Sequence, residues 1–312
     1  MSRILTYGET LLDIVFEDNV VKNAIPGGAM LNTSVSLGRL LIPVSLLSFT
    51  GNDEAGALIQ QFLSANNVST DNFKREENYK TGIALAFLDK FQNAHYSFYK
   101  ESKPVELSKP EIHENYIFAL ASFLAISDDY YQFTLDLLTK HLKKNGLVFY
   151  DPNFRKNHCQ DKEILLKRII EIIRKSEVIR ASDEDVLNLF GTSNADEIYQ
   201  EKSGFNNQIL ILTFGGDKVV LKTKNQYIEY NVPVIKLVNT IGAGDTFNAG
   251  LLAMFYHYNV NRINLSDFVN VHHEALIQGA IRFAAESCRS DANYIGIDFA
   301  KNQQSEFKSL IK

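Results

Sequence analysis

The chain has 312 residues, of which 45% are hydrophobic and 22% are charged, a balance typical of a folded globular protein rather than a disordered one. The formal net charge of −5 gives no support for a nucleic-acid-binding surface, and every apolar run is shorter than the roughly 18 residues of a membrane span. Two cysteines exclude a disulfide framework and are typical of a reducing compartment, so we expect a cytoplasmic protein without nucleic-acid or membrane partners.

Short apolar runs alternate with helical patterns along most of the chain. In chain order, the first half predicts a strand at Ile4–Tyr7, a hairpin at Ile14–Ile25, a helix with the stripe Leu31, Val35 and Gly38, a strand at Val44–Phe49, a helix with Leu58 and Phe62, a hairpin at Thr81–Lys100, a strand at Tyr116–Ala119 and a helix with Leu135, Leu138 and Leu142. The second half predicts a strand at Leu147–Tyr150, a helix after Asp161 with Leu165, Ile169, Ile172 and Ile173, a strand at Val178–Arg180, a helix capped by Asp183, a strand at Ile209–Thr213 and a long helix from Ser266 to about Cys288. This alternation predicts an α/β fold with a mostly parallel central sheet covered on both faces.

Two predicted hairpins interrupt the alternation. Ile14–Ile25 alternates apolar and polar residues around a polar turn, and Thr81–Lys100 does so around Asp89–Ala94. The hairpins predict a small secondary sheet, which is either a lid over a pocket or an ornament at the edge of the main sheet. Their apolar faces, such as that of Ile83, fit a homodimer contact as well as packing within the chain, and the sequence leaves both open.

The clearest chemical signal is a glycine-rich turn that leads into a helix, Gly242-Ala243-Gly244-Asp245 after Asn239-Thr240. Glycines let the backbone approach a ligand closely, and the free N–H groups at a helix start attract an anion such as phosphate. A carboxylate here repels phosphate unless it has a chemical task, and one such task is to accept the proton of a hydroxyl that attacks the phosphate. The alternative is a plain turn followed by a helix-stabilising acid. The turn is neither a Walker loop nor a dinucleotide fingerprint.

A second turn, Pro26-Gly27-Gly28, leads into a helix that carries Asn32 in its first turns. Gly28 allows close approach of a ligand, and the amide of Asn32 can both donate and accept a hydrogen bond. A flexible hinge followed by an ordinary polar helix residue is the alternative interpretation.

Polar residues also follow four of the predicted strands. They are Glu9 and Asp13, Asp151-Pro152-Asn153-Phe154-Arg155, Ser182-Asp183-Glu184-Asp185, and Thr213-Phe214-Gly215-Gly216. In parallel α/β sheets ligands bind at the carboxyl ends of the strands, so we expect a binding site there. Asp13 suits neighbouring hydroxyls of a polyol and Asp185 suits the water shell of Mg²⁺, whereas Asp183 needs no role beyond capping a helix.

These motifs resemble the signatures of the ribokinase/PfkB carbohydrate kinases. Gly242–Asp245 looks like the C-terminal signature of that family, Gly27-Gly28 with Asn32 looks like the N-terminal one, and Gly51–Gly56 is similar to its Gly-x-Asp-x-x-Gly turn. The resemblance runs from about Ile4 to Asn293. It implies one ribokinase-like αβα domain over residues 1–312, a β-sheet lid made by segments of about 14–26 and 81–104, and the use of ATP and Mg²⁺.

The resemblance also implies roles for individual residues. Asp245 would be the general base on a sugar hydroxyl, and the amides of Gly242, Ala243 and Gly244 would form the anion hole. The other assignments are Asp13, Gly28, Asn32, Lys100 and Arg155 to the sugar, Ser182, Thr213 and Gly215 to the nucleotide, and Asp185 to the metal. Asn239 stands where the family usually has Asp, a residue linked to a monovalent cation in some members, so the cation stays open. Ser182 and Asp185 replace the family's Asn-x-x-Glu.

Three segments resemble the branch of fructokinases and 2-keto-3-deoxygluconate kinases, namely Glu9–Asp13, Phe98–Lys100 and Asp151–Arg155. The keto-deoxy-acid kinases typically have Tyr-Tyr-Arg where this chain has Phe98-Tyr99-Lys100, and the loss of that tyrosine and arginine weakens carboxylate recognition. We therefore expect an ATP-dependent kinase that converts fructose to fructose 6-phosphate. A kinase of a keto-deoxy acid or a nucleoside and a sugar-binding sensor without catalysis are the alternatives.

Overall fold

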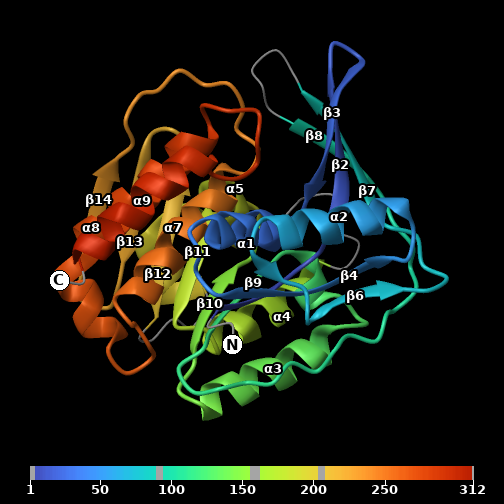
Figure 1. Ribbon diagram of the computed structural model, residues 1–312. Helices are drawn as coiled ribbons and strands as arrows, with labels where there is room; N and C mark the ends of the chain where they lie inside the picture. Colours follow the sequence, from blue (N-terminus) through green and yellow to red (C-terminus); the bar gives the residue numbers. More distant parts are fainter. Residues whose placement is uncertain (1–3, 89–93, 155–161, 203–207, 311–312) are drawn as a thin grey trace. The chain divides into compact units, whose positions relative to one another are not determined.

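The computed structural model describes residues 4–88, 94–154, 162–202 and 208–310 (Figure 1). Contacts within the chain divide it into two compact units. Unit 1 consists of Met1–Glu111, Ile235–Tyr258 and Gly279–Lys312, and unit 2 consists of Ile112–Val234 and Asn259–Gln278. Both units combine parallel strands with helices, which confirms the predicted α/β class.

The parallel strands of unit 1 are arranged around β4 (Val44–Gly51). β1 (Ile4–Tyr7), β5 (Val68–Ser69) and β6 (Phe73–Glu76) all pair with β4 in parallel. β1 and nearly all of β4 are buried, as expected for short apolar strands covered on both faces. The helices of this unit are α1 (Ala29–Arg39), α2 (Glu54–Ala65), α7 (Ala243–His257), α9 (Ile297–Leu310) and the C-terminal part of α8 (Leu265–Ser287).

The predicted buried face is confirmed for α1 and wrong for α2. In α1 the predicted stripe is buried, with Leu31, Val35 and Gly38. In α2 the predicted stripe is wrong, because Leu58 is 47% exposed whereas Ile59 and Leu63 are fully buried. The inward face of α2 also carries Gly56, where a Cβ would lie 2.1 Å from the carbonyl oxygen of Gly51. This close backbone contact requires glycine on the inward face of α2.

A separate four-stranded sheet consists of β2 (Leu11–Glu17), β3 (Val20–Gly27), β7 (Ile83–Leu88) and β8 (Ala94–Tyr99), in the order β3-β2-β7-β8. β2 and β7 run parallel, and each outer strand forms an antiparallel pair with its inner neighbour. Both predicted hairpins are therefore confirmed. The first is longer than predicted, so Asp13 lies inside β2, opposite Ile25 and Ala84.

The Gly51–Gly56 turn is hydrogen-bonded to Thr81, two residues before β7 of this second sheet. The carboxylate of Asp53 caps α2 by accepting a hydrogen bond from the Gly56 N–H (2.9 Å). It also accepts hydrogen bonds from the N–H (2.9 Å) and the hydroxyl (2.5 Å) of Thr81. Burial alone would raise its pKa, but these hydrogen bonds together outweigh burial, so the pKa of Asp53 lies below its usual value.

Among the described residues of unit 2, the parallel strands β9 (Ile117–Ala121), β10 (Leu147–Asp151), β11 (Val178–Ser182) and β12 (Ile209–Phe214) are neighbours in that order. They confirm the four strands predicted in this region. Two antiparallel strands that were not predicted, β13 (Lys218–Lys222) and β14 (Tyr227–Asn231), continue the sheet beyond β12. The helical segments are η1 (Phe123–Ile126), α3 (Tyr131–Lys143), α4 (Lys162–Arg174), α5 (Asp183–Phe190), α6 (Ala195–Glu197), η3 (Ile198–Lys202) and the first part of α8.

The helices of unit 2 confirm one predicted stripe and correct another. In α4 the predicted residues are all buried, namely Leu165, Ile169, Ile172 and Ile173. In α3 the buried face is shifted to Leu137, Leu138 and His141, because the His141 ring stacks on Phe118 of β9 with 4.4 Å between ring centroids. Leu135 and Leu142 are only partly buried.

The predicted helix starts also need correction. Helix α5 is capped by Ser182 rather than Asp183, because the Ser182 hydroxyl accepts the free N–H of Asp185. Helix α8 begins at Leu265, one residue before Ser266. Asp161 lies outside the described residues.

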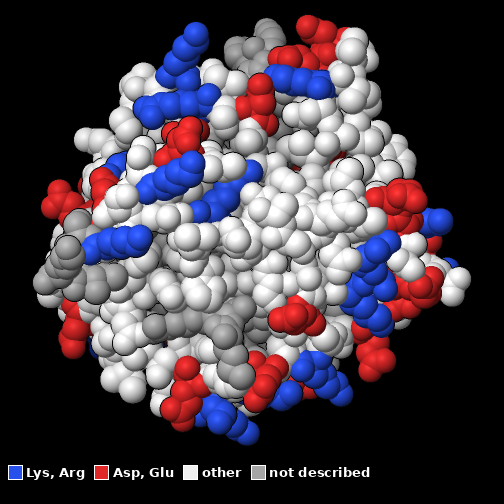
Figure 2. Space-filling model, in the orientation of Figure 1, with Lys and Arg blue, Asp and Glu red and all other residues white. Residues whose placement is uncertain are grey.

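The described surface carries charges of both signs. On the face shown in Figure 2, basic and acidic side chains are interspersed, in keeping with the small formal net charge of −5. None of the described helices has the length and apolar character that crossing a membrane requires.

Glu177 makes the stability of unit 2 depend on pH. Its carboxylate accepts a hydrogen bond from the Val148 N–H (2.8 Å) and pairs with Nε of Arg262 (3.0 Å). Burial nevertheless raises its pKa to about 7. Since the folded chain holds this proton more tightly than the unfolded chain, Glu177 favours folding at low pH, and that contribution is lost as the pH rises through about 7.

We expect the melting temperature of Glu177→Gln minus that of the wild type to be larger at about pH 8 than at about pH 5, because the amide cannot ionise. Thermal melts at the two pH values measure the change. The exposed residue Glu184, replaced by Gln, is the matched control. A difference between Glu177→Gln and the wild type that is the same at both pH values would contradict the prediction.

Candidate active site

Helix α7 begins at the predicted glycine-rich turn. Gly242 caps it with a left-handed backbone (φ 79°), and a Cβ there would lie 2.3 Å from the carbonyl oxygen of Asn293, so both conformation and space require glycine. The Thr246 hydroxyl lies 3.0 Å from the Gly242 carbonyl oxygen and 3.1 Å from that of Ala243, and so steadies the first turn. The first N–H groups of a helix have no acceptor within it, which suits an anion site, although here Ala243 N–H makes a long bond to Thr240 (3.3 Å).

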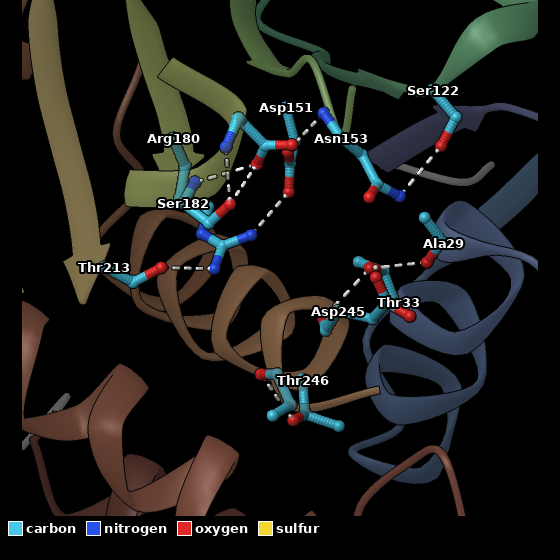
Figure 3. Close-up of polar contacts among 12 residues, drawn as sticks. Ala29, Thr33, Ser122, Asp151, Asn153, Arg180, Ser182, Thr213, Asp245 and Thr246 are labelled. Atoms are coloured by element: carbon cyan, nitrogen blue, oxygen red, sulfur yellow. Dashed lines mark hydrogen bonds and ion pairs between the residues drawn. The ribbon is translucent and has the colours of Figure 1, made fainter. Parts of the chain in front are cut away.

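Asp245 is the third residue of α7 and is held by α1. The amide nitrogen of Asn32 donates to Oδ2 of Asp245 (2.8 Å), and the Thr33 hydroxyl donates to the Asp245 carbonyl oxygen (3.0 Å; Figure 3). Asn32 and Asp245 are 213 positions apart in the sequence. The structure therefore brings the two predicted glycine signatures together.

Asp13 belongs to the same cluster. Its carboxylate lies against the backbone of Gly27, where a Cβ would be 2.0 Å from Oδ2. Burial, and to a lesser extent the charge of Asp245, raise the pKa of Asp13 to about 7. Hydrogen bonds from hydroxyl groups would stabilise the charged form of this buried carboxylate.

The other predicted sugar-binding residues have protein partners. Gly28 has φ 124°, and a Cβ there would lie 2.2 Å from the carbonyl oxygen of Glu9, so it is glycine because of the neighbouring backbone. Lys100, just after β8, forms an ion pair with Glu9 (2.6 Å). Arg155 lies outside the described residues.

We expect Gly27→Ala to raise the KM for the predicted sugar substrate about 10- to 100-fold, because the added methyl group must displace the Asp13 carboxylate. Steady-state kinetics with varied sugar measures the effect. Gly216→Ala is the matched control, since a Cβ at Gly216 meets nothing within 4 Å. An unchanged KM in Gly27→Ala would contradict this prediction.

In unit 2, a buried arginine joins the carboxyl ends of three neighbouring strands. Arg180 of β11 donates to Oδ2 of Asp151 on β10 (2.9 Å) and to the Thr213 hydroxyl on β12 (2.6 Å; Figure 3). Oδ1 of Asp151 accepts the Asn153 N–H (3.0 Å). Thr213 pairs with Ser182 in the sheet register, so both hydroxyls lie at the same edge.

Asp185 has a clear local role. Its Oδ2 accepts the N–H (2.9 Å) and hydroxyl (2.6 Å) of Ser182 in a capping box, and its Oδ1 accepts the Phe154 N–H (2.7 Å). Burial, followed by the nearby charge of Asp151, raises the pKa of Asp185. The part of the chain that the structure describes contains no group of three His, Cys, Asp or Glu side chains arranged to hold a metal. The metal role of Asp185 stays a prediction.

The structure thus groups the predicted residues within each unit. In unit 1 it brings together Asp13, Gly28, Asn32, Gly242, Ala243, Gly244 and Asp245. In unit 2 it places Ser182, Asp185, Thr213 and Gly215 at or just after the ends of β11 and β12. Gly215 has φ 51° in the turn after β12, with open space where a Cβ would be.

Two residues of these clusters were missed by sequence reasoning. Arg180 carried a signal, since a charge inside the apolar run of β11 needs a buried partner. Asn293 carried none, because it is a single asparagine in a polar turn. Its amide lies 3.5 Å from Asp13.

Comparisons with known proteins identify relatives in sequence and in fold. Residues 1–291 match the family described as pfkB family carbohydrate kinase. Relatives include a probable fructokinase-4 of Arabidopsis thaliana (26% identical, covering 100% of this chain and 97% of the relative) and a fructokinase of Rhizobium leguminosarum bv. trifolii (28% identical, covering 80% and 78%).

Solved structures with a similar fold include a fructokinase double mutant from Vibrio cholerae O395 with bound fructose, ADP and potassium (TM-score 0.81, 21% identity, 100% of this chain and 99% of that one). Another is aminoimidazole riboside kinase from Salmonella enterica (TM-score 0.82, 19% identity, 97% and 99%). These likenesses confirm the predicted ribokinase-like α/β fold. Because the family match extends over most of its length, the chain belongs to the pfkB family of carbohydrate kinases.

Proposed function

We propose that this carbohydrate kinase is a fructokinase, which transfers the terminal phosphoryl group of ATP to the primary hydroxyl of fructose and yields fructose 6-phosphate. The observation that carries the proposal is the position of Asp245 at the start of α7, where Asn32 orients its carboxylate (2.8 Å). A carboxylate beside an anion-binding helix start suits a base that receives the proton of the attacking hydroxyl. The names of the plant and bacterial relatives support fructose as the acceptor.

In this proposal the residues of unit 1 hold the sugar and stabilise the developing charge. Asp13 and Asn32 bind sugar hydroxyls, Asp245 takes the proton, and the N–H groups from Gly242 to Gly244 stabilise charge on the transferred phosphoryl group. The sheet β3-β2-β7-β8 acts as the lid of a single kinase domain. Its closure would exclude water, so that ATP is not hydrolysed without a sugar.

For ATP we propose the carboxyl ends of β11 and β12. The hydroxyls of Ser182 and Thr213 suit polar parts of a nucleotide, and the open space at Gly215 leaves room for it. When bound, ATP with Mg²⁺ supplies the phosphoryl group. Since both oxygens of Asp185 already accept local hydrogen bonds, we propose that phosphates and water hold most of the Mg²⁺ shell, with Asp185 contacting that water.

A riboside is the second candidate acceptor. The aminoimidazole riboside kinase of Salmonella enterica has a TM-score of 0.82, as high as that of the fructokinase structure. The shared fold therefore accommodates either kind of acceptor, and only the sugar-binding residues decide between them.

The test is ADP production from ATP and Mg²⁺ with fructose, 2-keto-3-deoxygluconate and a riboside in parallel, each with and without potassium. We expect fructose to give the highest kcat/KM. Asp245→Asn, purified in the same way, excludes a contaminating kinase. Turnover with only the acid or only the riboside would overturn the proposal, and fructose binding without ADP production would reveal a sensor.

A further inference from the structure

The Asp13 carboxylate has a single side-chain hydrogen-bond donor in the described part of the chain, the amide of Asn293. Nδ2 of Asn293 lies 3.5 Å from Oδ2 of Asp13. Both side chains belong to buried residues, with 1% of Asn293 and 6% of Asp13 exposed. The bare Cα of Gly27 lies against the same carboxylate. Asp13 is therefore confined between a glycine and an amide.

The backbone of Asn293 also packs closely against the first residue of the turn that begins α7. A Cβ at Gly242 would lie 2.3 Å from the Asn293 carbonyl oxygen and 2.7 Å from its Cα. One residue thus contacts both the predicted sugar-binding carboxylate and the turn of the predicted anion hole. Residues on both sides of Asn293 contact other elements of unit 1. Asp291 pairs with Lys22 of β3 (3.0 Å), and the Ile295 carbonyl accepts a hydrogen bond from Arg39 of α1 (2.6 Å).

We propose that Asn293 is a positioning residue for sugar phosphorylation, whose amide orients the Asp13 carboxylate toward the sugar hydroxyls and holds it in register with the start of α7. The inference rests on the proposed sugar-binding role of Asp13. Asn293 acts through Asp13 and does not touch the reacting atoms.

The charges around Asp13 explain why a donor matters there. Asp245 of α7 is the charged group that faces it, while its neighbours on the second sheet, Ile25, Gly27 and Ala84, are uncharged. Burial and Asp245 both disfavour the ionised form and raise the pKa of Asp13 to about 7. An amide donor opposes this shift by stabilising the carboxylate, which is the form that accepts hydrogen bonds from two hydroxyls.

Kinetics across pH distinguish positioning from packing. We expect Asn293→Ala to lower kcat/KM for fructose about tenfold near pH 7, mainly through KM, and to move the acidic limb of the profile to higher pH. The loss should shrink toward about pH 9, where Asp13 ionises without help. A packing defect would instead give the same loss at every pH. Asn293→Ser, which retains a donor, should recover part of the activity.

Asn293→Asp is a third variant, which keeps the shape of the side chain and replaces the donor by another acid. It should move the acidic limb further in the same direction. Asp291→Asn is the matched control in the same segment, since it breaks the ion pair with Lys22 and does not touch Asp13. An acidic limb that stays in place in both Asn293→Ala and Asn293→Asp would overturn the proposal.

A second readout needs no substrate. Carboxyl-carbon NMR of Asp-labelled protein follows the titration of Asp13, whose signal is assigned by its loss in Asp13→Asn. We expect a higher midpoint in Asn293→Ala than in the wild type. A raised midpoint in a protein that does not phosphorylate fructose would support the positioning of Asp13 and reject the proposed function, whereas an unchanged midpoint rejects the positioning alone.

Discussion

Replacing Asp245 by asparagine is expected to lower kcat about 10²- to 10⁴-fold while fructose still binds. The amide keeps the shape of the side chain but cannot accept the proton of the attacking hydroxyl. Asn32, which donates to Oδ2 of Asp245 (2.8 Å), continues to have an oxygen acceptor, so the contact between α1 and α7 survives. ADP production gives kcat, and calorimetric titration gives the affinity for fructose.

Asp267→Asn is the matched control for this loss. Asp267 is exposed and is the third residue of α8, as Asp245 is of α7, so both variants remove an acid from a first helical turn. The control should keep wild-type turnover. Near-normal kcat in Asp245→Asn would remove the assignment of the base, and lost turnover together with lost fructose affinity would instead assign Asp245 to substrate binding.

Replacing Arg180 by methionine is expected to cost about 3–5 kcal/mol of unfolding free energy, the range found when one partner of a buried ion pair is removed. Arg180 is 8% exposed and Asp151 is 1% exposed, so the variant removes a buried cation that pairs with a buried carboxylate. It also removes the donor to the Thr213 hydroxyl. Urea denaturation measures the loss.

Lys167→Met is the control, because Lys167 and Glu163 form an exposed ion pair on α4, and such pairs contribute little to stability. The double variant Arg180→Met with Asp151→Leu should regain much of the lost stability, since it removes both buried charges. A loss in Arg180→Met no larger than that of the control would show that water or another group compensates Asp151.

The parts of the fold that the sequence predicted are those decided by local physics. Runs such as Leu147–Tyr150 are buried along their whole length, and their continuous apolar character predicted covered strands. Gly242 has a left-handed backbone and no room for a Cβ, and only glycine meets both conditions. The turn could therefore be predicted from its glycines.

The features that sequence reasoning missed are decided by distant contacts. Either of two neighbouring stripes of α2 is apolar, and only packing against the rest of unit 1 buries Ile59 and Leu63 rather than Leu58. β14 has only Tyr230 buried, so its composition shows little of a core strand. Asn293 is 280 positions from Asp13, and no local sequence pattern predicts a contact over that separation.

The assembly of unit 1 from three stretches has a consequence for biosynthesis. Met1–Glu111 contributes Asp13, Ile235–Tyr258 contributes Asp245, and Gly279–Lys312 contributes Asn293. Because a ribosome releases the chain from its N-terminus, these side chains meet only after the third stretch has emerged. A copy that ends before Asn293 lacks this part of the site together with the whole of α9, and we expect it to leave the ATP of the cell unused.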